Sequence, residues 1–390
     1  MNLLYLSPHF PENFYLFALR AAQQGIKVLG ITDRNWSDLP HDLANSLHDH
    51  ERISSFNNKR EVLDATHRLS HRNGKIHWVE SHLEPWLEIE AAIRHEFLVP
   101  GLQPPNLDKV KRKSVMKKVF AHSGCRVAKS CLLNSSNDQA VYHFLKENPY
   151  PIIIKPDCGV GAIDTHKIES DEQLESFLKN RAPIVYIVEE FIDGQIVTFD
   201  GFCDYRGEVV FCTSHQYSFD ARQIANEGID FYYYNVRELD PDLAQRGYEA
   251  IRSLGIHNKF FHLEFFRCPD ESLVAIEINL RPPGGLSTDM MNFAHDIDIY
   301  NLWAQALLQE NSSFRYERKY HCAHVSRRDR FYDSYFYSHE ELCEKYASVL
   351  CHYQRLNPLY AQVMGEHAYL VRSPHMEEIH EIAQNFHKRA

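Results

Sequence analysis

The stretch FFHLEFFRCPDESLVAIEINLRPPGG, residues 260–285, carries the most informative pattern of the chain. Apolar and polar residues alternate on both sides of a short turn, residues 268–272, and this predicts a β-hairpin. Side chains two apart in a strand share a face. The second strand should therefore place one set of residues on a polar face, Glu277, Asn279 and Arg281. The apolar face should hold Ile276, Ile278 and Leu280.

Closing the hairpin should bring the polar faces of the two strands together. Glu264 on the first strand then lies beside Glu277 and Asn279, with Arg281 one step beyond. Carboxylate and amide oxygens are hard ligands of the kind that Mg²⁺ takes while it keeps waters and bridges phosphates. An adjacent arginine suits a phosphoryl group. The set predicts a magnesium–nucleotide site, although each residue alone is more often part of the solvated face of an ordinary strand.

Length, charge and cysteine content limit the class of protein. A chain of 390 residues is long enough for two or three domains, and its net charge of −11 argues against a general nucleic-acid binder. No apolar run approaches the ~20 residues of a membrane span, and the N-terminus lacks the features of a signal peptide. Nine cysteines without CxxC pairs indicate a reduced protein. These properties predict a cytoplasmic protein that binds neither nucleic acid nor membrane.

The first hundred residues alternate predicted strands and helices, which indicates a parallel, Rossmann-like layer. No GxGxxG motif follows the first strand. The expected strands are 3–6, 27–32, a short one at Ile53 and Phe56, and 76–79, and the expected helices are 14–24, 59–73 and 84–95. The segment PGLQPP, residues 100–105, is a natural boundary. Near the C-terminus, a strand over 360–371 and a helix over 376–387 are expected.

Beyond the boundary, three segments have features of a nucleotide site. A basic helix over 107–123 contains Lys113, and a strand over 150–156 ends at Lys155 before a loop with Gly159 and Gly161. Glycines allow backbone N–H groups to approach an anion, and a lysine adds a point charge. A solvated helix face and a simple turn are the ordinary alternatives, because the loop lacks the GK[ST] ending of a P-loop.

The third segment is the apolar strand 184–188, which ends in EEFIDG, residues 189–194. A strand that stops at such an edge can present its backbone to a flat heterocycle. Glu189 can then accept a hydrogen bond from an exocyclic amine such as adenine N6. Taken alone, a strand end with a polar turn at Asp193 and Gly194 is the commoner explanation.

The order of these motifs resembles the ATP-grasp superfamily, specifically its carboxylate–amine ligases. The tail RPPGG, residues 281–285, is similar to the amino-acid and dipeptide ligase branch, including carnosine-synthase-like members. The resemblance implies an α/β (α+β) chain, in which an N-terminal Rossmann-like parallel-sheet domain precedes an ATP-grasp fold of two α+β subdomains that enclose the nucleotide. The implied domains are 1–105, a central subdomain 106–188 with the lid loop, and a C-terminal subdomain 189–390 with the metal site.

The resemblance also implies roles for individual residues. Phosphates of ATP would be held by Lys113 and Lys155, under a lid loop running from Gly159 to Gly161. Adenine would be recognised by the segment Glu189, Glu190, Phe191 and Ile192. Two Mg²⁺ ions, or Mn²⁺ in their place, would be held by Glu264, Glu277 and Asn279. The catalytic residues would be Arg281, which steadies the transferred phosphoryl group, and Lys155.

One position departs from the family pattern. Many relatives have a ribose-binding glutamate two residues after the hinge glycine, and here that position is Ile196. Gln195 or Asp200 are the alternatives for that role.

The implied reaction converts a small carboxylic acid, such as an amino acid, to an acyl-phosphate with release of ADP, and an amine then displaces phosphate. Such chemistry needs positioning and charge neutralisation rather than a protein nucleophile. The alternatives are a small-molecule kinase on the same fold and a non-catalytic nucleotide-binding regulator. The expected partners are small-molecule carboxylate and amine substrates, with a homodimer left open.

Overall fold

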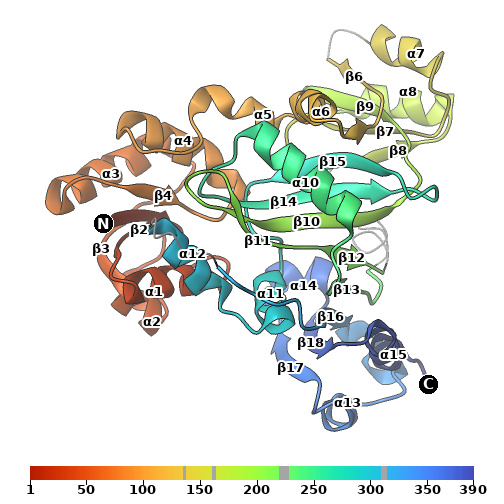
Figure 1. Cartoon of the computed structure of the whole chain (residues 1–390). Helices are drawn as coiled ribbons and strands as arrows, with labels where there is room; N and C mark the ends of the chain where they lie inside the picture. The colour runs from red at the N-terminus through yellow and green to blue at the C-terminus, as the bar shows by residue number, and fades with distance from the viewer. Residues whose placement is uncertain (135–137, 160–163, 219–227, 309–313) are drawn as a thin grey trace.

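The computed structural model describes residues 1–134, 138–159, 164–218, 228–308 and 314–390, and their strands form three sheets (Figure 1). Gly161 lies outside the described residues. No helix in the described part of the chain is long and apolar enough to cross a membrane.

The N-terminal sheet is parallel, with strand order β3-β2-β1-β4, and confirms the predicted Rossmann-like layer. Its strands are β1 (Asn2–Leu6), β2 (Lys27–Thr32), β3 (Leu47–Arg52) and β4 (Trp78–Glu80). Its helices are α1 (Tyr15–Gln23), α2 (His41–Ser46), α3 (Lys59–Asn73) and α4 (Leu87–Glu96). Leu3 and Tyr5 pack into one core cluster, and Leu4 and Leu6 into another. Both faces of the sheet are therefore covered, as is usual for parallel sheets.

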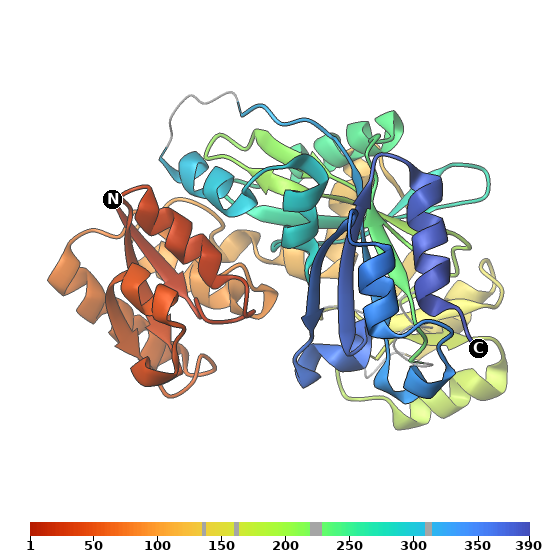
Figure 2. The ribbon, with the colours of Figure 1, turned by 90° about the horizontal axis from the view of Figure 1, so that it is seen from below.

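Part of this N-terminal core comes from far along the chain. Helix α12 (Ile299–Leu307) packs against α1 (Figure 1). Trp303 of α12 shares a buried cluster with Phe17 and Phe260. The N-terminal layer lies at one side of the large sheet, and the C-terminus lies at the other (Figure 2). The N-terminal layer is therefore held to the rest of the molecule by aromatic packing.

The second sheet is antiparallel, with order β6-β9-β7-β8, and we call it the lid sheet. It consists of β6 (Ser130–Leu133), β9 (Tyr186–Glu190), β7 (Ile152–Pro156) and β8 (His166–Ile168), with α7 (Gln139–Leu145) and α8 (Asp171–Asn180) packed on it. Ile152, Ile154 and Val188 face the core beneath these helices. Because strand side chains alternate, Ile153, Lys155 and Glu189 face the opposite side.

The large sheet has the order β17-β18-β16-β13-β12-β10-β14-β15-β5, with β11 paired to β10. Its central strands are β10 (Gln195–Cys203), β14 (Phe260–Arg267), β15 (Leu273–Asn279) and β5 (Arg126–Val127). The remaining strands are β11 (Val209–Thr213), β12 (His215–Tyr217), β13 (Tyr232–Asn235), β16 (His321–Arg327), β17 (Leu350–Arg355) and β18 (His367–Ser373). Its helices include α6 (Lys113–His122), α10 (Pro241–Leu254), α11 (Ser287–His295), α13 (His339–Lys345) and α15 (Met376–His387).

Strands β14 and β15 form the predicted hairpin. Glu264 is the register partner of Glu277, and His262 is the partner of Asn279. The register shifts between Glu264 and Phe265, which marks a β-bulge. The bulge breaks the simple alternation, so Ile276 lines the same cavity as Glu277 and the expectation for Ile276 was wrong.

Three local predictions also differ from the structure. The third strand is β3 rather than a strand at Ile53 and Phe56, because polar residues form this edge strand and the two apolar residues pack beyond its end. The helix expected over 107–123 is divided into α5 (Asp108–Lys111) and α6, because Arg112 is extended and bridges Cys158. The strand expected over 360–371 is α14 (Pro358–Met364) followed by β18, with Gly365 at a positive φ between them.

Candidate active site

A cavity of about 280 Å³ lies between the lid sheet and the large sheet. Eight residues predicted for the site line it: Lys113, Lys155, Glu189, Glu190, Phe191, Ile192, Glu264 and Glu277. Its other lining residues are Ile153, Thr165, Asp193, Gly194, Ile196, Tyr217, Phe266 and Ile276. Residues from helix α6, the lid sheet and the hairpin therefore meet in one place, although they are separated by more than 150 positions in the sequence.

Three predicted residues lie beside the cavity rather than among its lining residues. Asn279 is buried, and its Nδ2 lies 3.4 Å from Glu277 Oε1. Arg281 is half-buried and donates from Nη1 to the carbonyl oxygen of Pro282 at 2.8 Å. Gly159 has a φ of 145° at the start of the lid loop, and its carbonyl oxygen accepts from Lys113 Nζ at 2.8 Å.

Lys113 is positioned by contacts at the first residues of α6. Its backbone N–H donates to the Asp157 carbonyl oxygen at 2.8 Å, and the Ser114 N–H donates to the Asp157 carboxylate at 2.8 Å. Asp157 directly follows β7 and so ties the helix to the lid sheet. The Lys113 ammonium then forms an ion pair with Glu277, Nζ to Oε2 3.0 Å, inside the cavity.

Glu189 is held between two lysines. Its carboxylate lies 3.0 Å from Lys155 Nζ and 3.0 Å from Lys117 Nζ, and all three residues are buried. Burial raises the pKa of Glu189, but the two ammonium groups outweigh burial and the pKa is lowered. Burial similarly lowers the pKa of Lys155, but Glu189 outweighs that effect and the pKa is raised. Lys117 was not predicted for the site, although its place one helical turn after Lys113 is visible in the sequence.

The segment between β9 and β10 forms one edge of the cavity. The Glu190 side chain points away to accept from the Lys129 N–H at 2.8 Å, and the Glu190 N–H donates to the Lys129 carbonyl oxygen at 3.0 Å. Lys167 lies over the ring of Phe191, 4.9 Å from its centroid. Farther in, Ile196 on β10 is the register partner of Phe266 on β14. The floor of the cavity between this edge and Glu264 is therefore apolar.

Asp200 does not reach the cavity. It is fully buried and is held by His262 Nδ1 at 2.6 Å and by His215 Nδ1 at 2.6 Å. The suggestion that Asp200 takes the ribose-binding role was therefore wrong. Burial lowers the pKa of His262, but the neighbouring Asp200 and Glu264 carboxylates outweigh it and raise the pKa to about 9.

Glu84 also reaches the end of the hairpin from the N-terminal layer, and no local motif around it indicates this contact. Its Oε2 accepts from the Leu280 N–H at 2.9 Å, and burial raises the pKa of Glu84 to about 7. Lys259 forms buried ion pairs with Glu80 and Glu90, which lie before and after Glu84 in the sequence, and so holds the segment that carries Glu84. Glu84 could be found only from the structure, because it lies almost 200 residues before Leu280.

The hairpin offers a donor set that fits a divalent cation. Glu264 and Glu277 are register partners on adjacent strands and both line the cavity, with the Asn279 amide adjoining. Two carboxylates and an amide oxygen suit Mg²⁺ bound partly by water and phosphate. The described residues contain no group of three or more His, Cys, Asp or Glu side chains placed to hold an ion. The residues therefore fit a cation that a bound nucleotide helps to hold, and they do not form a site that the protein completes alone.

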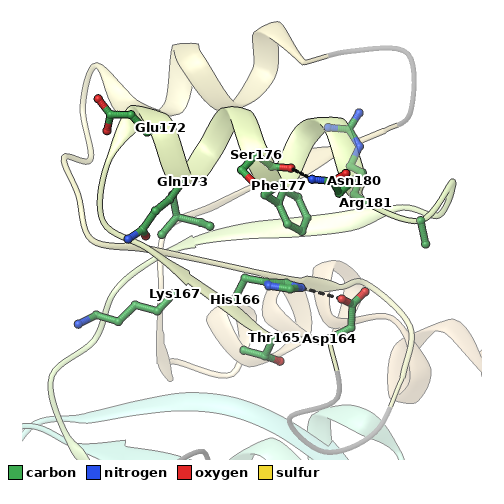
Figure 3. Close-up of a pocket in the computed structure, with 12 residues that line it drawn as sticks. Asp164, Thr165, His166, Lys167, Glu172, Gln173, Ser176, Phe177, Asn180 and Arg181 are labelled. Atoms are coloured by element: carbon green, nitrogen blue, oxygen red, sulfur yellow. Dashed lines mark hydrogen bonds and ion pairs between the residues drawn. The ribbon is translucent and has the colours of Figure 1, made fainter.

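A second hollow lies in the lid, between α8 and β8 (Figure 3). It is open and has a volume of about 1000 Å³. Asp164 and His166 form an ion pair of 2.7 Å there, and Arg181 pairs with Asp138. Thr165 is the residue that it shares with the smaller cavity, and none of the predicted site residues lines it. The candidate active site is therefore the smaller cavity.

The lid sheet and the large sheet thus enclose one cavity that lysines and carboxylates line. Residues 148–289 match the ATP-grasp domain family, which is the family that the motif order resembles. These residues include Lys155, Glu189 and the whole β14–β15 hairpin. No curated protein sequence matches the chain.

Solved structures of low sequence identity share the fold over nearly the whole chain. The L-amino acid ligase of Bacillus licheniformis is 16% identical, with a TM-score of 0.74 over 99% of this chain and 96% of that chain. The N5-carboxyaminoimidazole synthetase of Staphylococcus aureus, complexed with ADP, is 12% identical, with a TM-score of 0.71 over 97% and 95%. The biotin carboxylase domain of the Hydrogenobacter thermophilus 2-oxoglutarate carboxylase, with MgADP and bicarbonate, is 14% identical, with a TM-score of 0.69 over 100% and 90%.

Proposed function

We propose that this ATP-grasp enzyme is an ATP-dependent ligase that joins a small carboxylic acid, an amino acid in the first instance, to an amine and releases ADP and phosphate. The observation that carries the proposal is the cavity in which Lys113 and Lys155 face the paired carboxylates Glu264 and Glu277. Further support comes from the solved structures of the same fold, which are named as ligases, synthetases and carboxylases and two of which contain ADP.

In the proposed reaction the acid carboxylate attacks the γ-phosphorus of ATP, and the bond to the β-phosphate oxygen breaks to release ADP. The amine then attacks the acyl carbon, phosphate leaves with the bonding electron pair, and the amine loses a proton. Lys113 and Lys155 hold the phosphates from two sides of the cavity, and Arg281 neutralises charge on the transferred group. These residues act by position and charge.

Mg²⁺ would be held by Glu264, Glu277 and Asn279. When bound, it would neutralise phosphate charge as a Lewis acid. The two hairpin carboxylates and the Asn279 amide are too few to hold the ion by themselves, so the nucleotide and water would supply further ligands. This arrangement supports an ion that enters with the nucleotide, and Mn²⁺ would serve as a substitute.

The adenine ring would lie against the segment from Glu189 to Ile192. Both oxygens of Glu189 are already paired with lysines, so an adenine amine would share a carboxylate whose position is fixed. The Glu190 carbonyl oxygen and the backbone of Ile192 would complete recognition, because the Glu190 side chain and its N–H are both bonded to Lys129. Gly159, whose carbonyl oxygen accepts from Lys113 Nζ, would lie beside the phosphates.

A small-molecule kinase is the second candidate, since transfer to one substrate would use the same lysines and carboxylates. The full set of charged groups favours either enzyme over a regulator that only binds a nucleotide. The proposed ligase would act on small molecules in the cytoplasm. Size-exclusion chromatography would show whether it forms a homodimer.

The test is a screen of amino acids and small carboxylates, singly and in pairs, for phosphate release with ATP and Mg²⁺. A ligase releases ADP and phosphate only when an acid and an amine are both present. A kinase yields a stable phosphorylated product with one substrate. Glu277→Gln is the control for contaminating ATPase. If this variant formed product as fast as the wild-type protein, the proposal would be contradicted.

A further inference from the structure

A chain of buried polar side chains runs behind Glu264, on the side away from Glu277. Asn235 Nδ2 donates to His215 Nε2 at 3.0 Å, and His215 Nδ1 donates to Asp200 at 2.6 Å. The other oxygen of Asp200 accepts from His262 Nδ1 at 2.6 Å, and His262 Nε2 donates to Glu264 Oε1 at 2.9 Å. The chain crosses the large sheet from β13 through β12 and β10 to β14.

Stability alone does not explain this chain. Asp200 and His215 are 0% exposed and His262 is 5% exposed. Removing charged groups from water is expensive, and well-packed apolar residues would serve the fold as well or better. The neighbouring buried strands are rich in Phe and Leu, which are such residues. A buried polar chain at this position therefore indicates that Glu264, the residue at its end, needs to be held in place.

The hydrogen-bond directions fix the orientation of each member. Carboxylate oxygens only accept, so His262, which contacts a carboxylate at each ring nitrogen, donates from both. Asn235 donates to His215, which leaves the His215 Nδ1 proton for Asp200. Thr198 donates its hydroxyl proton to the same Asp200 oxygen. Asp200 is therefore held from three sides, and it holds the His262 ring in one orientation.

The consequence appears at Glu264. Its Oε1 accepts a hydrogen bond from His262 Nε2, and no group among the described residues donates to its Oε2. Glu264 lines the cavity opposite Glu277. A carboxylate fixed through one oxygen can present the other to a ligand without first losing rotamer freedom.

We propose that Asp200 and His262 are positioning residues, which hold the Glu264 carboxylate ready for a divalent cation shared with Glu277 and a bound nucleotide. The inference rests on the proposed function only in taking Glu264 and Glu277 as cation ligands. Neither Asp200 nor His262 touches the nucleotide or the acid. Loss of either should weaken cation binding and leave nucleotide binding without metal unchanged.

The experiment compares the full-length wild-type protein with Asp200→Asn, which has the same shape but cannot accept from two histidines and Thr198 as a carboxylate does. Mn²⁺ binding is measured by electron paramagnetic resonance in the presence of ADP. ADP binding with a chelator present is measured by calorimetry. The matched control is Asp230→Asn, because Asp230 is a buried carboxylate paired with Tyr335 and Arg389 in the C-terminal part of the chain.

We expect Asp200→Asn to weaken Mn²⁺ binding about 10-fold to 100-fold, the usual effect of removing a group that orients a metal ligand. Metal-free ADP affinity should stay within about twofold, and Asp230→Asn should change neither quantity. A merely structural role would lower both affinities together or neither, and either result would overturn the proposal. If Asp200→Asn does not fold, His262→Phe keeps a ring without donors and should show the same selective loss.

The wild-type protein separates this inference from the proposed function. Absence of Mn²⁺ binding with ADP present would contradict both the proposed function and the positioning role, because Glu264 would then not be a cation ligand. Normal Mn²⁺ binding in the wild-type protein and in both variants would remove the positioning role alone.

Discussion

Lys113 of α6 and Glu277 of β15 form an ion pair across the cavity, Nζ to Oε2 3.0 Å, and both side chains are nearly buried. The lysine proposed to hold phosphate and the carboxylate proposed to hold a cation thus neutralise each other. A nucleotide that arrives with a cation can replace both partners at once, phosphate at the lysine and cation at the carboxylate. Each residue can therefore be tested by a separate substitution.

Replacing Lys113 by Gln should weaken ADP binding. A hydrogen bond to a charged group contributes about 1.5–3 kcal/mol, which corresponds to roughly a 10-fold to 100-fold loss of affinity. Calorimetry with ADP and Mg²⁺ measures this. Lys111→Gln is the matched control, because Lys111 pairs with Glu88 at the surface. Equal affinities for Lys113→Gln and the wild-type protein would show that Lys113 does not contact phosphate.

Replacing Glu277 by Gln should abolish ATP turnover, by at least about 100-fold, because a neutral amide cannot balance the charge of a cation. The amide oxygen still accepts from Lys113, so the fold should persist, as circular dichroism would check. Glu271→Gln in the turn of the same hairpin is the control, since Glu271 is exposed and pairs with Arg267. Wild-type turnover by purified Glu277→Gln would exclude Glu277 as a cation ligand.

Replacing Lys117 by Met should affect stability more than binding. Lys117 is one of two buried partners of Glu189 and does not line the cavity. Its loss should lower the free energy of unfolding by about 1–3 kcal/mol, as measured by urea titration, and change ADP affinity by less than about threefold. Lys118→Met, at the exposed neighbouring position, should change neither. A large loss of ADP affinity would instead place Lys117 on the phosphates.

The sugar of the nucleotide should contribute little to binding. Between Glu264 and the segment that would hold adenine, the cavity floor is Ile196 and Phe266, which cannot form hydrogen bonds. We expect 2′-deoxy-ADP to bind within about threefold of ADP, because Ile196 and Phe266 offer the 2′-hydroxyl no acceptor. Ile196→Glu should create a preference for ADP of about 10-fold, and Ile196→Leu should not. A strong preference for ADP in the wild-type protein would refute this prediction.

Glu84 should make stability depend on pH. Burial raises the pKa of Glu84 to about 7 in the folded state, well above its value in the unfolded chain. Between these two pKa values the folded state binds more protons, so the free energy of unfolding falls as pH rises through this window and levels off above it. The fall should be roughly 2–3 kcal/mol between about pH 5 and about pH 8.

Glu84→Gln is the comparison, because an amide oxygen can still accept from the Leu280 N–H and does not titrate. Urea titrations of both proteins at the two pH values give the difference that is due to Glu84. If the wild-type protein and Glu84→Gln lose the same free energy, Glu84 is ionised in the folded protein at both pH values.

Short-range patterns were enough for much of the fold. The hairpin of β14 and β15 was predicted because alternation over two strands and a turn of Pro, Asp and Ser are local properties. The parallel N-terminal layer followed from regular strand–helix alternation, and α15 was predicted with its observed bounds. Local patterns were weaker at β3, where an edge strand carries polar residues, and at Arg112, where the helix is broken by a bridge to Cys158.

The residue types of the site can be read from the linear chain, because lysine-, glutamate- and glycine-bearing motifs occur in a definite order along it. Which of these residues meet depends on the fold. Only folding places Lys113 on Glu277, gives Glu189 a second lysine in Lys117, and buries Asp200 behind Glu264. These relationships join strands and helices far apart in sequence, and their strength depends on burial. Neither contact nor burial can be read from a single linear pattern.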